Sequence, residues 1–182
     1  YKDWLGNFYP QFVPQADFLK FYSSKFTTVE IDMTFYRIPT EEMVLRWART
    51  VPDNFIFAAK FPQTVTHEGT TASRLADAHT FIGVMRHLGD KLGPLLLQFP
   101  HSFRPEQEDL LMRLMGAMPE DVRISVELRN KAWLTQEHVF KCMHDKNIAL
   151  CLTEHPWMPR ITRQTADFVY VRFLGDHRKI ED

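Results

Sequence analysis

Short apolar runs recur along the chain and predict β-strands. Each run is rich in β-branched and aromatic residues, which favour strands. The six runs are FTTVEI (26–31), FIFAAK (55–60), PLLLQF (94–99), RISVEL (123–128), NIALCL (147–152) and DFVYVRF (167–173).

Helical signals fill the stretches between these runs, and the clearest begin at Thr40, Ser73, Pro105 and Thr135. Thr40 suits an N-cap, because its hydroxyl can accept a hydrogen bond from an amide in the first turn. From Ser73 to Leu92, apolar residues recur every three or four positions, which predicts an amphipathic helix.

The alternation of strand and helix predicts one α/β domain over residues 1–182, with parallel strands joined by helical crossovers. Two architectures fit this order, an open doubly wound sheet and a closed (β/α)8 TIM barrel. The phosphate-binding patterns GxGxxG and GxxxxGK[ST] are absent from a chain with 7 glycines, so the doubly wound sheet loses its best support.

The strands also carry polar residues on the face opposite their apolar ones, near their carboxyl ends. Val29 and Ile31 alternate with Glu30 and Asp32, and Phe57 and Ala59 alternate with Lys60 in the next strand. In the later strands, the residues that share the polar face are Gln98, Glu127, Arg129, Tyr170 and Arg172. Side chains in a barrel alternate between the helices and the interior, so this pattern predicts a ring of polar groups at the barrel mouth, with Val169 and Val171 facing helices.

Composition narrows the class of protein further. A net charge of −1 and a pI of about 6.8 give no overall field that would attract nucleic acid or an anionic membrane. No apolar run approaches the ~20 residues needed to cross a bilayer. The two cysteines, Cys142 and Cys151, lie in a helical and a strand pattern, which fits a reducing compartment and makes the cytoplasm the expected location.

Several segments resemble the YecE-like family (domain of unknown function 72), TIM-barrel proteins of unknown function. They are YKDWLGNFYP, FTTVEIDMTFYRIP, FIFAAKFPQTVTHE, LGDKLGPLLLQFP, VELRNKAWL and YVRFLG, and they cover nearly the whole chain in order. The resemblance implies a TIM barrel and implies no substrate or reaction.

The resemblance also implies missing elements. Similar proteins have a strand and a Gly/Ser-rich turn before the first of these segments, and at least one more strand and helix after the last. A closed barrel of this type has eight strands and ~200 to 400 residues. We therefore expect a barrel fragment, or a chain that lacks its ends.

Glu30 and Glu127 are the candidates for general acid and base, because two carboxylates in different surroundings can differ in proton affinity. The alternative is a structural layer in which carboxylates and guanidinium groups hold the barrel together. Barrel enzymes place catalytic groups at strand ends, so we favour catalysis. Lys60 is a third catalytic candidate, because a lysine in an apolar setting can become the neutral amine that forms a Schiff base.

Lys60, Arg129 and Arg172, with Arg37 nearby, predict a cationic rim suited to phosphate or carboxylate. The other candidates for ligand binding at the same mouth are Asp32, Tyr36, His67, Gln98 and Tyr170. The predicted ligand is therefore a small anionic or phosphorylated molecule.

Other patterns support different hypotheses. His67, His101, His155 and His177 follow strands and could hold a divalent metal, but no pair has diagnostic ligand spacing, so we predict no metal site and no cofactor. Aromatic side chains could stack on a base or a sugar, although such clusters more often close a core; they are Tyr1, Trp4, Phe8, Tyr9, Phe35 and Tyr36.

The favoured hypothesis is a barrel that binds a small anion and carries acid/base chemistry, as a hydrolase or a lyase. One alternative is a metal-dependent phosphodiester hydrolase or nucleic-acid repair protein. Another is a non-catalytic module that binds a ligand or a protein. The pattern predicts no contact with a membrane and leaves the oligomeric state open.

Overall fold

The computed structural model describes residues 4–154 and 158–174 of the chain and contains a curled, six-stranded parallel sheet. The strands follow one another in sequence order, β1-β2-β3-β4-β5-β6, so each strand pairs with its neighbours along the chain. Their bounds are Thr28–Ile31, Ile56–Lys60, Leu92–Phe99, Ile124–Leu128, Ala149–Glu154 and Tyr170–Phe173. All of the strand pairs are parallel, as the alternating pattern predicts.

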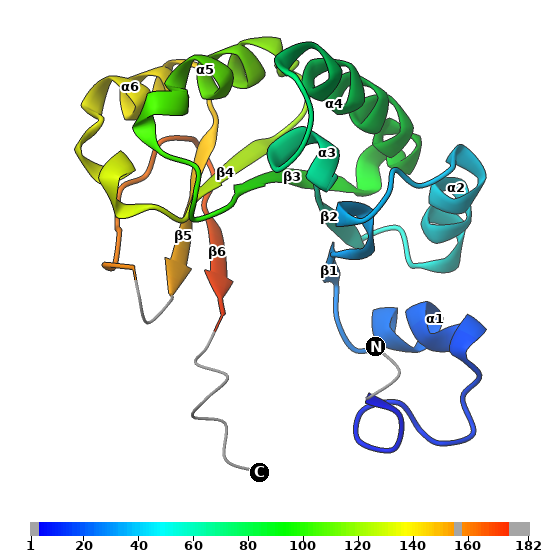
Figure 1. The fold of residues 1–182 in the computed structure, drawn as a ribbon. Coiled ribbons are helices and arrows are strands. Elements are labelled where there is room, and N and C mark those ends of the chain that lie inside the picture. Colours follow the sequence, from blue (N-terminus) through cyan, green and yellow to red (C-terminus); the bar gives the residue numbers. More distant parts are fainter. Residues whose placement is uncertain (1–3, 155–157, 175–182) are drawn as a thin grey trace.

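Helices cover the outer, convex face of this sheet (Figure 1). The α-helices are α1 (Phe18–Ser23), α2 (Glu41–Thr50), α3 (Gln63–Thr66), α4 (Thr71–Met85), α5 (Glu108–Ala117) and α6 (Glu137–Asp145). Short 3-10 helices lie between them, namely η2 (Gln15–Asp17), η3 (Met33–Phe35), η4 (Arg86–Lys91), η5 (Pro105–Gln107) and η6 (Lys131–Thr135). The described residues thus form an α/β half-barrel, with β1 and β6 at its two edges.

Two of the predicted helix starts are displaced. Thr40 caps α2 as expected, and its Oγ1 accepts a hydrogen bond from the amide of Met43. The long helix begins earlier than Ser73, because Thr70 provides the N-cap and accepts from the Ser73 amide. Helix α6 begins at Glu137 rather than beside Thr135, because residues 131–135 form the tighter turns of η6.

The two faces of the sheet contain different cores. The outer faces of the strands and the inner faces of the helices form one large apolar core that includes Phe57, Leu97, Val126 and Trp133. A small second cluster lies on the concave face and consists of Ala58, Leu96, Cys151 and Tyr170. The predicted alternation is therefore confirmed for the strands β2, β3 and β4.

The last strand departs from this pattern. Val169 and Val171 were predicted to face helices, but their side chains are 50% and 47% exposed. The described segment between β5 and β6, residues 158–169, forms no helix, so no helical crossover covers this face of β6 within the described part of the chain.

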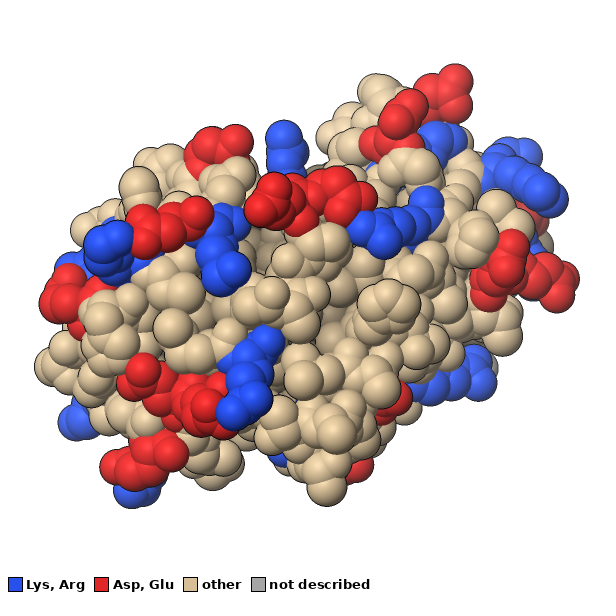
Figure 2. All heavy atoms as spheres, turned by 90° about the horizontal axis from the view of Figure 1, so that it is seen from above, with Lys and Arg blue, Asp and Glu red and all other residues tan. Residues whose placement is uncertain are grey.

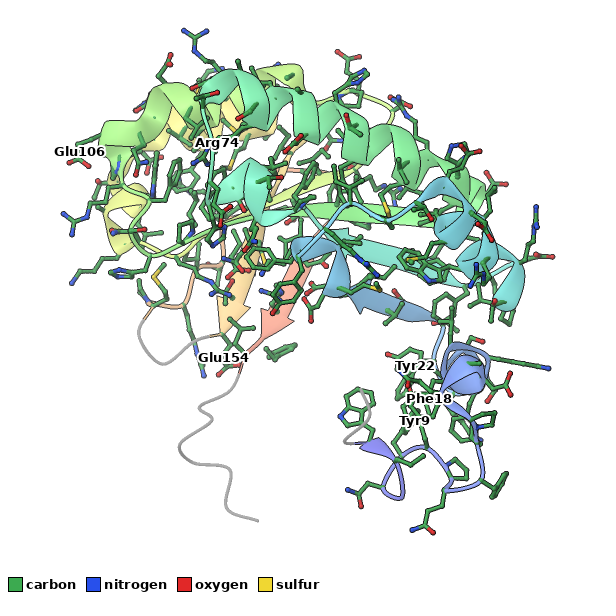
Figure 3. All side chains as sticks on the ribbon, turned by 45° about the vertical axis from the view of Figure 1, so that its right-hand side comes forward. Tyr9, Phe18, Tyr22, Arg74, Glu106 and Glu154 are labelled. Carbon is green, nitrogen blue, oxygen red and sulfur yellow. The ribbon has the colours of Figure 1, made fainter. Side chains whose placement is uncertain are left out.

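The aromatic residues near the start of the chain pack on one another. The rings of Tyr9 and Phe18 stack with their centroids 4.0 Å apart, and Tyr22 lies in the same group (Figure 3). Phe8 makes edge contacts with Tyr9 and Tyr22. The packing interpretation therefore fits these side chains better than a stacking platform does. Tyr1 lies outside the described residues.

Charges on the helical face are mixed. Figure 2 shows acidic and basic side chains interspersed over this face, without a large area of one sign. Exposed ion pairs such as Arg86–Asp121 and Arg113–Asp109 contribute to this arrangement. The face therefore offers no broad basic surface for a nucleic-acid backbone.

No helix in the described residues is long and apolar enough to cross a membrane.

The two cysteines form no disulfide, and Cys151 is buried in the small concave cluster, where burial raises the pKa of its thiol to about 12. Both observations agree with the interpretation of the cysteines as small apolar residues.

Gly93 marks a close approach of β3 to β2. A Cβ atom at this position would lie 2.6 Å from Ile56 Cγ2 and 3.0 Å from the carbonyl oxygen of Phe57. We predict that Gly93→Ala lowers the free energy of unfolding by about 1–3 kcal/mol, because the strands must separate to admit the methyl group. Urea denaturation measures this loss.

Gly83 provides the matched control. It lies exposed in α4, and a Cβ atom at this position would have no neighbouring atom within 4 Å. Gly83→Ala should therefore raise the free energy of unfolding by about 1 kcal/mol through helix propensity. Equal effects of the two substitutions would contradict the close approach at Gly93.

Candidate functional site

The candidate site lies at the carboxyl ends of the strands, on the concave side of the sheet. The strand register brings the predicted polar residues to the same level: Gln98 pairs with Glu127 between β3 and β4, and Thr153 pairs with Arg172 between β5 and β6. Because side chains alternate along each strand, residues at this level share the concave face. The predicted polar residues of these strands therefore lie together at the carboxyl ends of the half-barrel.

Arg172 joins the two edges of the sheet. Its Nη2 and Nε donate to Glu30 Oε1 and Oε2 at 2.7 and 3.1 Å, which connects β6 with β1. Its Nη1 donates to Glu127 Oε2 at 2.7 Å, which adds β4 to the same network. One planar guanidinium group thus binds two carboxylates from different strands, an arrangement that suits the fixed fork of arginine.

Two further residues complete the network. The Tyr170 hydroxyl donates to Glu30 Oε2 at 2.6 Å, and Arg129 Nε donates to Glu127 Oε1 at 2.6 Å. Burial raises the pKa of Tyr170, and the charge of Glu30 raises it further. Tyr170 therefore stays a neutral donor. Glu127, which is only 1% exposed, has both of its oxygens bound to arginines.

The network also determines the charge of Arg172. Burial alone would lower the pKa of this guanidinium group, but the neighbouring Glu127 and Glu30 outweigh burial and raise it. Arg172 is therefore a permanent cation whose charge is balanced within the site. We refer to Glu30, Glu127, Arg129, Tyr170 and Arg172 as the edge network.

A second group of residues meets at the ring of Phe35. Lys60, the last residue of β2, places its Nζ 3.9 Å from the centroid of this ring. His67, which follows the short helix α3, packs edge-on against the same ring with centroids 5.0 Å apart. Because both side chains touch Phe35, a lysine amine and an imidazole from separate segments lie close to one another.

Phe35 is held in place by a neighbouring hydroxyl. Thr34 is buried in η3, and its Oγ1 lies 2.6 Å from the carbonyl oxygen of Lys60 and 2.9 Å from that of Ile31. This contact ties η3, which carries Phe35, to the end of β2. The backbone that carries Phe35 is therefore held next to Lys60.

Both basic groups at Phe35 lose proton affinity in this setting. Burial lowers the pKa of Lys60, and the like charges of Arg172 and Arg129 lower it further. Asp32 and Glu127 act in the opposite direction, but their effects are smaller. Burial likewise lowers the pKa of His67, with added effects of Lys60, Arg129 and Arg74. Burial and the neighbouring cations thus disfavour the charged forms of both Lys60 and His67.

Arg74 is one of the charges that lower the pKa of His67, and the sequence analysis did not identify it. It lies on the buried face of α4, where its Nε donates to Gly69 O and its Nη1 donates to Val65 O in α3 (Figure 3). Its position four residues before the buried Ala78 is a signal that could have identified it, because that spacing places a charged residue on the apolar stripe of the helix.

Two hollows adjoin these groups. The larger, about 810 Å³, lies alongside β1 and includes Glu30, Asp32, Phe35, Tyr36 and Lys60 in its lining. The smaller, about 340 Å³, has a lining that includes His67, Gln98, His101, Glu127 and Arg129. The Phe35 group and the edge network therefore have space beside them for a small molecule.

Not every predicted residue belongs to these groups. Tyr36 lines the larger hollow but is 74% exposed, and Gln98 is buried with its Nε2 donating to the Phe99 carbonyl at 3.3 Å. Arg37 is exposed and lines neither hollow, so the structure does not bring it to the predicted cationic rim.

The metal hypothesis gains no support from the described residues. Within residues 4–154 and 158–174, no three His, Cys, Asp or Glu side chains are arranged to hold a metal ion. His67 and His101 both line the smaller hollow, whereas His155 and His177 lie outside the described residues.

The comparisons with known proteins agree on one family. The model of the family "Protein of unknown function DUF72" matches residues 1–182. UPF0759 protein YecE of Escherichia coli (strain K12) is 33% identical over 114 residues, which is 62% of this chain and 41% of that protein. UPF0759 protein YunF of Bacillus subtilis (strain 168) is 28% identical over 135 residues, which is 70% of this chain and 48% of that protein. The matches thus span less than half the length of these curated relatives.

Solved structures show the same likeness in three dimensions. A DUF72 family protein from Thermotoga maritima MSB8 superposes with a TM-score of 0.82 at 27% identity, covering 98% of this chain and 72% of that one. A DUF72 family protein from Enterococcus faecalis V583 superposes with a TM-score of 0.75 at 26% identity, covering 85% and 62%. The resemblance identified from the sequence segments is therefore confirmed.

The burial of Glu127 leads to a stability prediction. Glu127→Gln removes a buried charge that is bound to two arginines, so we expect a loss of about 3 kcal/mol or more in the free energy of unfolding. Chemical denaturation followed by tryptophan fluorescence measures this change.

The control is Glu42→Gln, which removes the carboxylate of an exposed pair with Arg46 and should cost less than about 1 kcal/mol. If both variants unfolded at the same urea concentration, Glu127 would have no structural role in the edge network.

Proposed function

The chain belongs to the DUF72 family, whose function is unknown, and we propose that it binds a small molecule carrying a phosphate or carboxylate group at the concave strand ends. We further propose that the curled sheet is part of a (β/α)8 barrel. The sheet order and the likeness to solved DUF72 structures support this second proposal. The strand ends would then correspond to the face where TIM barrels bind their ligands.

One observation carries the proposal. Lys60 forms no ion pair with a carboxylate of any described residue, whereas Arg129 and Arg172 at the same level are both paired. A half-buried ammonium group beside two arginines is in an unfavourable environment, and an anion in the adjacent hollow would relieve it. An added anion would also stabilise the protonated form of His67.

The division of roles follows from these contacts. Lys60 and His67 would bind the anionic group, with Arg129 contributing from the rim of the smaller hollow. Glu30 and Glu127 would position Arg172 and Arg129 rather than transfer protons, because arginine and tyrosine donors already bind their carboxylate oxygens. The assignment of the two carboxylates as acid and base stays a prediction, as does the cytoplasmic location.

The first test is the binding of sulfate to the full chain. We expect Lys60→Met to weaken sulfate binding by roughly tenfold or more, because a hydrogen bond to a charged group contributes about 1.5–3 kcal/mol. Titration of sulfate followed by NMR chemical shifts measures the affinity. Loss of affinity without a change in the thermal midpoint would support the proposal.

Lys25→Met is the matched control for this test. Lys25 also lies over an aromatic ring, that of Phe21, at 5.7 Å. It precedes β1, so it lies toward the amino ends of the parallel strands, whereas Lys60 ends β2 at their carboxyl ends. Its removal should leave sulfate binding unchanged. Equal affinities of the Lys60 and Lys25 variants would contradict the proposed anion site.

The second test uses His67 as a sensor. We predict that sulfate raises the pKa of His67 from its lowered value, because an adjacent anion favours the imidazolium form. By linkage, sulfate should bind more tightly as the pH falls from about 6.5 toward the lowered pKa of His67. Sulfate itself stays doubly charged in this range, so the change reports on the protein.

The Hε1 resonance of His67, followed during pH titrations with and without sulfate, measures this shift. His79 lies exposed on α4 and provides an internal reference, whose resonance should not respond to sulfate. An unchanged titration curve for His67 at saturating sulfate would show that the anion does not bind beside it.

A further inference from the structure

Two lysines are partly buried among the residues that the structure describes, Lys60 and Lys91, and their amines have very different surroundings. Lys91 Nζ donates to the carbonyl oxygens of Ala48 and Val51 at 2.8 and 2.9 Å and lies 3.4 Å from Asp53 Oδ1. These contacts leave the Lys91 amine occupied by acceptors of the protein itself. Lys91 is thus a structural lysine that connects α2 to the start of β3.

Lys60 has no comparable acceptors. Its amine makes no hydrogen bond to a described residue, and its closest defined contact is the face of the Phe35 ring at 3.9 Å. Every fully shielded side-chain nitrogen among the described residues has a hydrogen-bond partner. The Lys60 amine has no such partner, so it must be at least partly exposed to solvent. It is therefore partly desolvated yet accessible from the larger hollow.

The charges around Lys60 favour loss of its proton. Arg129 and Arg172 repel the ammonium form, and burial acts in the same direction. The ring of Phe35 opposes them, because an aromatic face attracts a cation. The balance lowers the pKa of Lys60. A lysine beside other cations, with its amine accessible, has the properties of an imine-forming nucleophile.

We propose that Lys60 forms a covalent imine with an aldehyde or ketone that also carries a phosphate or carboxylate group. This inference rests on the proposed anion site and adds the substrate class and the reacting atom. The anionic group would lie toward His67, which contacts the same Phe35 ring as Lys60, and the carbonyl group would meet Lys60 Nζ.

Imine formation requires only the Lys60 amine, the carbonyl compound and water. The lone pair of the neutral Lys60 amine attacks the carbonyl carbon, and the carbonyl electron pair passes to oxygen, which takes up a proton. The resulting carbinolamine loses its hydroxyl group as water after a second protonation, and the nitrogen keeps one hydrogen as a protonated imine. Solvent that reaches the amine can supply and accept these protons, so no oxidant, reductant or metal is needed.

The experiment traps the imine on the full chain. The protein is incubated with pyruvate or with dihydroxyacetone phosphate in the presence of cyanoborohydride, and the modified lysine is identified by peptide mass spectrometry. We expect an adduct at Lys60 with the mass of the ligand less one oxygen atom. Labelling of Lys25, which is exposed and lies outside the site, should be at least about tenfold lower, because it lacks the cationic neighbours of Lys60.

Three controls define the result. Acetone, which has no anionic group, should label Lys60 much less than pyruvate does, and added sulfate should protect Lys60 from both anionic probes. Lys60→Arg keeps the positive charge but cannot form an imine, so this variant should retain folding and show no adduct at position 60.

The outcomes separate this inference from the proposed function. Labelling of Lys60 that sulfate suppresses would support both. Intact sulfate binding without an adduct at Lys60, or with labelling spread evenly over the lysines, would overturn the imine and leave the anion site standing. Absence of both sulfate binding and the adduct would overturn both.

Discussion

The contact between Arg172 and Glu30 holds the curled shape of the sheet at its open side. β1 and β6 share no backbone ladder, and the edge network spans the space between them with side chains. An ion pair that is shielded from water recovers its desolvation cost only when its hydrogen bonds are well formed, and here both carboxylates and the guanidinium group are multiply bonded. The edge network therefore connects the carboxyl ends of β1, β4 and β6.

The sequence predicted well on which face of the sheet a strand residue lies. It predicted poorly which residues far apart in the chain come into contact. Alternation along the strands correctly placed Glu30, Lys60 and Glu127 on the concave face, because the two-residue period of a strand is a local property. It could not indicate that Arg172 would bind Glu30, since these residues are 142 positions apart and meet only because the sheet curls. The weighing of catalysis against a structural layer favoured catalysis for Glu30 and Glu127, and their contacts with arginines and Tyr170 support the structural alternative.

Local sequence signals also failed to fix a helix start where two residues could serve as the N-cap. Thr70 and Ser73 can both cap a helix, and the structure uses Thr70, which lies closer to the preceding turn at Gly69. Val171 alternates with Arg172, as expected for a barrel strand, yet it remains exposed. Burial also requires a helix packed against that face of the strand, and the described residues between β5 and β6 form none. The strand pattern placed Lys60 at a strand end, but it did not show that Lys60 would lack the acceptors that Lys91 has. Their difference arises from acceptors that the fold brings to one amine and not to the other.

The contact between Thr66 and His67 has a consequence for how protons can move at the site. Thr66 Oγ1 is buried and lies 2.7 Å from His67 Nδ1. In the neutral ring, the hydroxyl can donate to Nδ1, which leaves the hydrogen on Nε2; in the charged ring, Nδ1 donates and the hydroxyl accepts. A rotation of one hydroxyl hydrogen is thus enough to accommodate both states. His67 can therefore change its tautomer and its charge while its heavy atoms, and the ring of Phe35 beside it, stay where they are.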